Sequence, residues 1–203
     1  MVLIKPDAIK NSLTGYILSR FSEFHTGLRF AALKVVAVNL ALAEEHYAEH
    51  KGKFFYPSLL EYIRGYLHYP DEPSKRRVIA IIYRGPNAIK NIREICGNTN
   101  PHEARAQRPG CIRSLGTIIP LYDAKGKFIG DRSDNLIHAS ANIQDAEREI
   151  KLWFLPTDIP PTVRSYPAET SKEYYYYKNG AISSEYTPGS YCFIGPGDLV
   201  WKS

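Results

Sequence analysis

Short apolar runs alternate with amphipathic segments through the first three quarters of the chain, and this alternation limits the folds open to it. Residues 30–38 are β-branched and apolar, as in a strand, whereas Ile17, Phe21 and Phe24 recur at the spacing of one helical face. The order β-α-β-α-α-β-α-β-α permits a ferredoxin-like α/β sandwich, although periodicity alone does not select it over other α/β arrangements. Strands are predicted at residues 1–5, 30–38, 78–83 and 135–138, and helices at residues 13–24, 41–50, 58–67, 86–96 and 142–154.

A histidine closes the last predicted strand, and a hydroxyl and a carboxylate follow it closely. Ser140 lies two residues after His138, and Glu149, on the next predicted helix, can accept an imidazole proton. Asn135 can add a local hydrogen bond. A neutral imidazole fixed by such neighbours can attack a phosphorus centre. A lone histidine at a strand end is more often a structural hydrogen-bonding group, so His138 is a candidate nucleophile that needs support from elsewhere.

Cationic side chains stand near the ends of other predicted elements. Lys5 ends the first strand, Arg93 lies on the helix at residues 86–96, and Thr99 and Arg113 follow in the loops beyond it. Lysine and arginine at element ends often bind phosphate. The formal net charge of +5 suits an anionic substrate, although a basic surface also has simpler explanations.

Five motifs occur in one order along residues 1 to about 155. They are Ile4-Lys5-Pro6-Asp7; His46-Tyr47 with Phe54-Phe55; Gly97-Asn98-Thr99-Asn100-Pro101; Arg108-Pro109-Gly110-Cys111-Ile112-Arg113; and Asn135-Leu136-Ile137-His138-Ala139-Ser140 with Ala146-Glu147-Arg148-Glu149-Ile150. This stretch resembles the nucleoside diphosphate kinase family, in which the motifs follow one another in the same order. Any single motif would be weak, but five in order make chance a poor explanation.

The resemblance implies an enzyme that transfers a phosphoryl group from a nucleoside triphosphate, typically ATP, to a nucleoside diphosphate. A phosphohistidine on His138 would give ping-pong kinetics. It also implies a four-stranded antiparallel sheet with helices over one face, Mg2+ bound through substrate phosphates rather than protein ligands, and a homohexamer or tetramer.

Site residues can be carried over position by position. His138 matches the nucleophile, Ser140 and Glu149 match the pair that orients it, and Phe55 matches the aromatic that stacks on the base. Stacking tolerates every base, so base selectivity should be low. The positions that hold phosphates and sugar are matched by Lys5, Tyr47, Arg93, Thr99, Arg113 and Asn135.

The chain departs from the family at two small residues and two insertions. Ala8 and Ala139 stand where glycine is usual, which would cost about 1 kcal/mol at each site if the backbone there required positive φ. Insertions are expected at about residues 65–75 and 114–129, and the second has a hairpin pattern. We expect it to form an extra ribbon near the site or at a subunit contact.

The last quarter of the chain differs in composition from the rest. We divide the chain into a kinase-like domain at residues 1–155 and a Tyr-, Pro- and Gly-rich extension at residues 156–203. Its aromatic content argues against disorder and favours packing on the core or across a subunit boundary. Short strands are predicted at residues 191–194 and 199–201.

Other classes of protein are less well supported. Two alternatives stay open: a nucleotide-binding regulator in which the departures have disabled transfer, and a nucleic-acid-binding module that uses the net charge and the tail aromatics. His46 and His50 have a spacing that zinc ligands can have, but no Glu follows His46, so the metalloprotease pattern fails. Three widely spaced cysteines and the lack of a long apolar run predict a cytoplasmic protein with reduced thiols, and family members commonly have a few more residues before the first strand.

Overall fold

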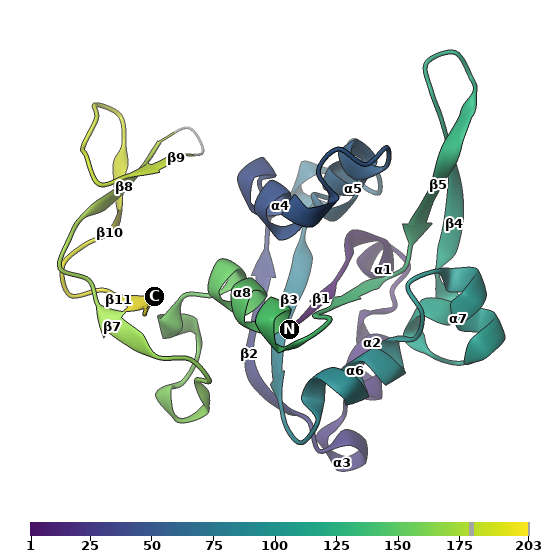
Figure 1. Cartoon of the computed structure of the whole chain (residues 1–203), viewed down its shortest axis with the longest axis horizontal. Helices are drawn as coiled ribbons and strands as arrows, with labels where there is room; N and C mark the ends of the chain where they lie inside the picture. The colour runs from purple at the N-terminus through teal and green to yellow at the C-terminus, as the bar shows by residue number, and fades with distance from the viewer. Residues whose placement is uncertain (179–180, 203) are drawn as a thin grey trace.

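A four-stranded antiparallel sheet forms the centre of the protein in the computed structural model, which describes residues 1–178 and 181–202 (Figure 1). Its strand order is β2-β3-β1-β6, as in the predicted ferredoxin-like sandwich. All neighbours run antiparallel, and Leu3 of β1 pairs with His138 of β6. The strands are β1 (Val2–Ile4), β2 (Arg29–Val36), β3 (Val78–Arg84) and β6 (Ile137–Ala139).

Helices follow the strands, and several start at residues suited to begin a helix. Asn39, Asn100 and Asn142 each accept a hydrogen bond from a first-turn backbone N–H. The helices are α1 (Pro6–Lys10), α2 (Thr14–Arg20), α3 (Glu23–Thr26), α4 (Leu40–His46), α5 (Tyr56–Ile63), α6 (Ala88–Cys96), α7 (Pro101–Gln107) and α8 (Ile143–Trp153). Short 3-10 turns are η1 (Ala48–His50), η2 (Pro73–Lys75), η3 (Ile112–Leu115), η4 (Pro156–Asp158) and η5 (Pro161–Val163).

The sheet has a hydrophobic core on each face, so helices cover both faces and not one as expected. Side chains alternate along β1 because successive residues of a strand point to opposite sides. Leu3 packs in one cluster with residues of α4, α5 and α8, whereas Val2 and Ile4 pack in the other with residues of α2 and α6. All three side chains of β1 are buried, which fixes the register of the strand that precedes Lys5.

Two local predictions were wrong. The helix expected at residues 13–24 ends at Arg20, and Phe24 on the following α3 is 93% exposed instead of sharing a face with Ile17 and Phe21. Helix α7 was not predicted, because its short polar segment lacks an apolar period. Its start is instead fixed by Asn100, whose Oδ1 accepts hydrogen bonds from the backbone N–H groups of His102 and Glu103.

The second insertion forms the predicted hairpin. Strands β4 (Thr117–Tyr122) and β5 (Phe128–Asp134) pair only with each other and project from the body of the protein on the side away from the C-terminal extension (Figure 1). A proline is tolerated at position 120 because the outer edge of β4 has no neighbour that needs its missing N–H. The first insertion folds into a turn and η2.

The described part of the C-terminal extension, residues 156–178 and 181–202, contains five short strands in two small sheets. Trp201 packs against the core cluster that contains Phe154 and Trp153, and its indole Nε1 donates to the carbonyl of Phe154 at 2.7 Å. Ile159 is buried in the same cluster. The strands are β7 (Ala168–Thr170), β8 (Tyr175–Lys178), β9 (Ala181–Ser183), β10 (Tyr191–Ile194) and β11 (Leu199–Trp201).

Two further sequence expectations concern cysteines and membrane spans. Cys96, Cys111 and Cys192 are all free, as predicted. Within the part of the chain that the structure describes, none of the helices combines the length and the apolar character required to cross a bilayer.

We predict that the extension stabilises the domain through Trp201. Trp201→Ala should lower the free energy of unfolding by about 2 to 3 kcal/mol, because it removes a half-buried aromatic and its hydrogen bond. That loss corresponds to a fall in melting temperature of roughly 4 to 12 °C for a chain of this size. Truncation of the chain at Pro156 should lower the melting temperature at least as much.

Tyr186→Ala provides the matched control for thermal melting. Tyr186 belongs to the same extension and is 63% exposed, so its removal should change stability by no more than about 0.5 kcal/mol. Equal melting temperatures for Trp201→Ala and the unaltered chain would contradict the prediction.

Candidate functional site

His138 lies at the centre of a cavity of about 360 Å³ that nearly all the predicted site residues share. The strand β6 positions it, and its side chain is 19% exposed. Among the predicted residues, Ser140 alone does not line this cavity, and it reaches His138 indirectly through a carboxylate. The predicted residues that line the cavity are Lys5, Tyr47, Phe55, Arg93, Thr99, Arg113, Asn135, His138 and Glu149.

The carboxylate of Glu149 fixes the orientation of the His138 ring. Its Oε1 lies 2.9 Å from Nε2 of His138, and its Oε2 accepts from the hydroxyl of Ser140 at 2.5 Å. An ionised carboxylate only accepts hydrogen bonds, so Nε2 of His138 carries the proton. The lone pair of the neutral ring is therefore on Nδ1, the nitrogen that this pair leaves free to act as a nucleophile.

The side chain of Asn135 bonds to Lys5 and Thr99, whereas the sequence suggested a local hydrogen bond near His138. Its Oδ1 accepts from Nζ of Lys5 at 2.8 Å, and its Nδ2 donates to the carbonyl of Thr99 at 2.9 Å. The amide thus links the end of β1 to the loop before α7. This contact sets the position of the Lys5 ammonium in the cavity.

Two backbone carbonyls and one side-chain hydroxyl hold Arg113. Its Nε and Nη2 donate to the carbonyl of Ile137, the residue before His138, and its Nη1 donates to the carbonyl of Gly97 and the hydroxyl of Thr99. These neutral acceptors solvate a guanidinium that is only 6% exposed without neutralising its charge. The charge remains available to an anion bound beside His138.

Two neighbouring side chains, His46 and Tyr47, also line the cavity of His138. The ring of His46 meets that of His138 edge to face at 4.6 Å between centroids, and Nδ1 of His46 accepts from the indole of Trp153 at 3.2 Å. Tyr47 lines the cavity and is 6% exposed, and its hydroxyl has no hydrogen-bond partner among the described residues. Sequence reasoning matched Tyr47 to the site but gave His46 no role in it.

Burial and neighbouring charges shift two pKa values in the cavity. Burial, followed by the positive charges of Lys5 and Arg113, holds the pKa of His138 well below its usual 6.5. Burial lowers the pKa of Lys5 to about 8, although Asp7 opposes the shift. At neutral pH the cavity therefore combines an uncharged imidazole with charged cations, which favours nucleophilic attack on an anionic phosphorus centre.

The geometry of His46, His138 and Glu149 resembles a metal site, because one ligand atom from each lies within 4.8 Å of the others. The hydrogen bonds indicate instead that His46 does not offer a lone pair to a metal. An indole N–H only donates, so Nδ1 of His46 is an acceptor and the neutral ring has its proton on Nε2, where a metal would need a lone pair. Burial holds the pKa of His46 well below 6.5, so the ring stays in this form.

The backbone is unstrained at Ala8 and Ala139, the two positions where the family resemblance predicted glycine. Ala8 lies inside α1, and neither it nor Ala139 belongs to the non-glycine residues with positive φ. Leu136 does, with φ of 69°, two residues before His138. Its N–H donates to Oδ2 of Asp7 at 2.9 Å, and its carbonyl accepts from the N–H of Lys5, so two hydrogen bonds hold the strained residue.

Three residues of the inserted hairpin also line the cavity, and sequence reasoning did not name them. They are Asp131, Arg132 and Ser133 of β5. The sequence predicted a ribbon near the site or at a subunit contact, and the hairpin does lie near the site. Which of its side chains would face the cavity depends on the strand register, which no residue pattern in the sequence specified.

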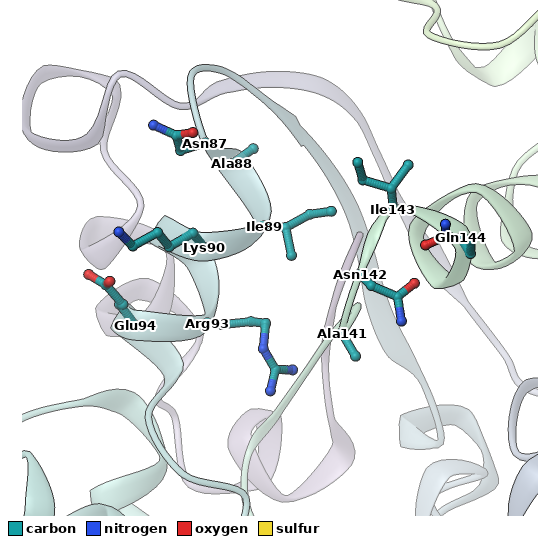
Figure 2. Close-up of a pocket in the computed structure, with 10 residues that line it drawn as sticks. All are labelled: Asn87, Ala88, Ile89, Lys90, Arg93, Glu94, Ala141, Asn142, Ile143 and Gln144. Carbon is teal, nitrogen blue, oxygen red and sulfur yellow. The ribbon is translucent and has the colours of Figure 1, made fainter.

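A wider, open hollow of about 850 Å³ adjoins the cavity and shares Arg93 with it. Figure 2 shows its lining between α6, which carries Ile89 and Lys90, and the segment of Ala141 and Asn142 that precedes α8. His102, at the start of α7, lines neither hollow and is exposed.

Comparison with known proteins gives one consistent result. A family model described as nucleoside diphosphate kinase matches residues 1–159. A nucleoside diphosphate kinase of Thermus thermophilus is 37% identical over 158 residues, which is 78% of this chain and 96% of the relative. One of Mycobacterium bovis is 40% identical over 154 residues, 76% of this chain and 94% of the relative.

Solved structures agree. The Aquifex aeolicus nucleoside diphosphate kinase superposes with a TM-score of 0.60 at 31% identity, over 78% of this chain and 96% of that one. A Borrelia burgdorferi enzyme, described as a transition-state mimic with bound vanadate and ADP, has a TM-score of 0.59 at 30% identity, over 81% and 90%.

Proposed function

The chain belongs to the nucleoside diphosphate kinase family, and from that premise we propose that it transfers phosphate through Nδ1 of His138. The observation that carries the proposal is the pairing of Nε2 with Glu149 in a cavity lined by Lys5, Arg93 and Arg113. This arrangement presents a lone pair where a polyphosphate would be attracted. The family activity is phosphoryl transfer from a nucleoside triphosphate to a nucleoside diphosphate.

In the first half-reaction, Nδ1 of His138 attacks the terminal phosphorus of the triphosphate. The N–P bond forms as the bond to the bridging oxygen breaks, and the nucleoside diphosphate leaves with the electron pair. The ring gains positive charge as it bonds to phosphorus. Glu149, already at 2.9 Å from Nε2, stabilises that charge and holds the ring in line. A second nucleoside diphosphate reverses these steps and gains the phosphate.

The cations and Tyr47 act on the phosphoryl group itself. In flight it carries negative charge on three oxygens, and preorganised donors in a water-poor cavity stabilise it strongly. Lys5 and Arg113 are each 6% exposed or less and need little rearrangement to do so. The unpartnered hydroxyl of Tyr47 is a further donor for a phosphate oxygen.

We propose Mg2+ as the cofactor, carried by the nucleotide. Two carboxylates of the cavity already have partners: Glu149 bonds to His138 and Ser140, and Glu49 lies 3.5 Å from His50. Phosphate oxygens and water would be the main ligands, as Mg2+ prefers. The ion would offset phosphate charge during transfer.

An active enzyme is better supported than the alternative of a disabled nucleotide-binding regulator. The two alanines that replace glycine leave the backbone unstrained, and the nucleophile, its carboxylate and the cations all reach one cavity. A nucleic-acid-binding module gains no support from the site, because Lys5 and Arg113 are buried in a small cavity instead of forming an open basic face.

Labelling with γ-labelled ATP tests the nucleophile. The protein should gain acid-labile, base-stable label that is discharged by added nucleoside diphosphate, and His138→Ala should abolish both. Glu149→Gln should slow labelling by roughly a hundredfold or more, since removing one stabilising group in a catalytic site typically costs that much. Chelating Mg2+ should also suppress labelling.

His102→Ala is the matched control, because His102 is exposed and outside the cavity. It should label like the unaltered chain. Label retained by His138→Ala would exclude His138 as the nucleophile.

The pH dependence of kcat/KM should have limbs set by the two shifted pKa values. A histidine with a lowered pKa is protonated only in stronger acid, so the acid limb should fall well below pH 6.5. A lysine with a pKa of about 8 loses its charge above that pH, so phosphate binding and kcat/KM should decline there.

Lys5→Met should abolish the alkaline limb of the residual activity, whereas Lys51→Met, at an exposed lysine outside the cavity, should leave it in place. An alkaline limb that persists in Lys5→Met would refute the assignment.

We also propose a homohexamer or tetramer in the cytoplasm, with residues 1–155 as the catalytic domain and residues 156–203 as its extension. The two buried, free thiols Cys96 and Cys111 suit a reducing compartment.

Light scattering of the purified chain should give a mass four or six times that of the 23.0 kDa chain. A monomeric mass at micromolar concentration would contradict this assembly.

A further inference from the structure

The inserted hairpin is anchored at the end of the cavity where Phe55 lies. Gly130 of β5 packs so closely on Phe54 that a Cβ there would lie 2.3 Å from the ring, and its φ of +134° also requires glycine. Phe54 in turn meets Phe55 edge to face at 5.3 Å between centroids. The aromatic expected to stack on the base and the hairpin therefore build the same wall.

Arg132 is fixed in that wall by three hydrogen bonds. Its Nε and Nη2 bind the two oxygens of Asp134 at 2.7 and 3.2 Å, and its Nη1 donates to the hydroxyl of Ser58 on α5 at 3.2 Å. A forked contact to a carboxylate holds the guanidinium flat and offsets its charge. The side chain is 13% exposed and lines the cavity.

The two insertions meet behind this residue. His68, from the first insertion, places Nε2 at 2.9 Å from Oδ2 of Asp134. Burial would raise the pKa of Asp134, but its hydrogen bonds from His68 and Arg132 lower it overall, so the carboxylate that holds Arg132 stays ionised. Both segments predicted to be insertions thus help to fix one planar side chain in the cavity that Phe55 lines.

Resting on the proposed function, we propose that Arg132 is a specificity-determining residue that stacks on the nucleobase, which binds between its guanidinium face and Phe55. A flat, paired guanidinium stacks well on aromatic rings, and its contribution grows with the ring area it covers. Purine nucleotides therefore gain more from Arg132 than pyrimidine nucleotides do. The enzyme prefers purine diphosphates, in contrast to the base tolerance that Phe55 alone would give.

Equilibrium binding measured by calorimetry tests this assignment with Mg2+ complexes of ADP, GDP, CDP and UDP and with inorganic pyrophosphate. Arg132→Leu keeps an apolar wall but removes the planar face. It should weaken ADP and GDP binding by about tenfold, CDP and UDP binding by about threefold, and pyrophosphate binding hardly at all. Arg132→Lys keeps the charge but not the plane and should show the same ranking.

Lys125→Leu is the matched control, since Lys125 is an exposed cation at the tip of the same hairpin, outside the cavity. It should bind all five probes like the unaltered chain. Thermal melting of each variant checks folding, and Arg132→Lys carries the test if Arg132→Leu does not fold.

Unchanged binding of the four nucleotides would overturn the assignment. An equal loss for nucleotides and pyrophosphate would overturn it too, because Arg132 would then act on phosphate. Formation of the phosphohistidine is measured separately: its absence from the unaltered chain would refute the proposed transfer while leaving the comparison of bases valid.

Discussion

The buried carboxylate of Glu149 is the interaction on which the site depends. At 3% exposure an ionised carboxylate must be hydrogen-bonded, and its two oxygens are used by His138 and Ser140. Because these partners lie on β6 and just after it, the helix α8 can dock in only one rotation about its axis. The hydrogen bond from Nε2 of His138 satisfies the carboxylate and also selects the tautomer of the imidazole. The packing of α8 and the free lone pair on Nδ1 therefore have one cause.

Burying the cations of the site removes them from water, and nearby hydrogen-bond acceptors replace the lost solvation. Lys5 and Arg113 are buried, and each is solvated by fixed oxygens: the amide of Asn135 for Lys5, backbone carbonyls for Arg113. Burial lowers the pKa values of Lys5 and His138, and the nearby positive charge of Arg113 lowers both further. An arriving polyphosphate places negative charge beside these buried cations, which favours its binding.

Sequence reasoning predicted the parts of this protein that depend on local pattern or on ordered motifs. The strands, the pairing of His138 with Glu149, and the hairpin all follow from residues close together in the chain. It failed where tertiary contacts decide. Phe24 keeps the helical period of Ile17 and Phe21 but falls beyond the end of α2, and Asn135, adjacent in sequence to the nucleophile strand, bonds to Lys5 across 130 positions. Trp153, which bonds to His46, and Ser58, one of the two partners of Arg132, likewise lie far away in sequence.

Residues 65–75 and the hairpin of β4 and β5, the two segments predicted to be insertions, contact each other through His68 and Asp134. A ribbon of two strands is marginally stable alone, so β4 and β5 need anchors on the domain. Three contacts provide them where the ribbon meets the cavity: Gly130 packs on Phe54, Arg132 donates to Ser58, and Asp134 of β5 bonds to His68. Because the ribbon of β4 and β5 is held in place at the cavity, its residues form part of the cavity wall. The contacts that stabilise the ribbon are therefore also the contacts through which it acts on a bound nucleotide. A substitution that weakens them should change nucleotide binding as well.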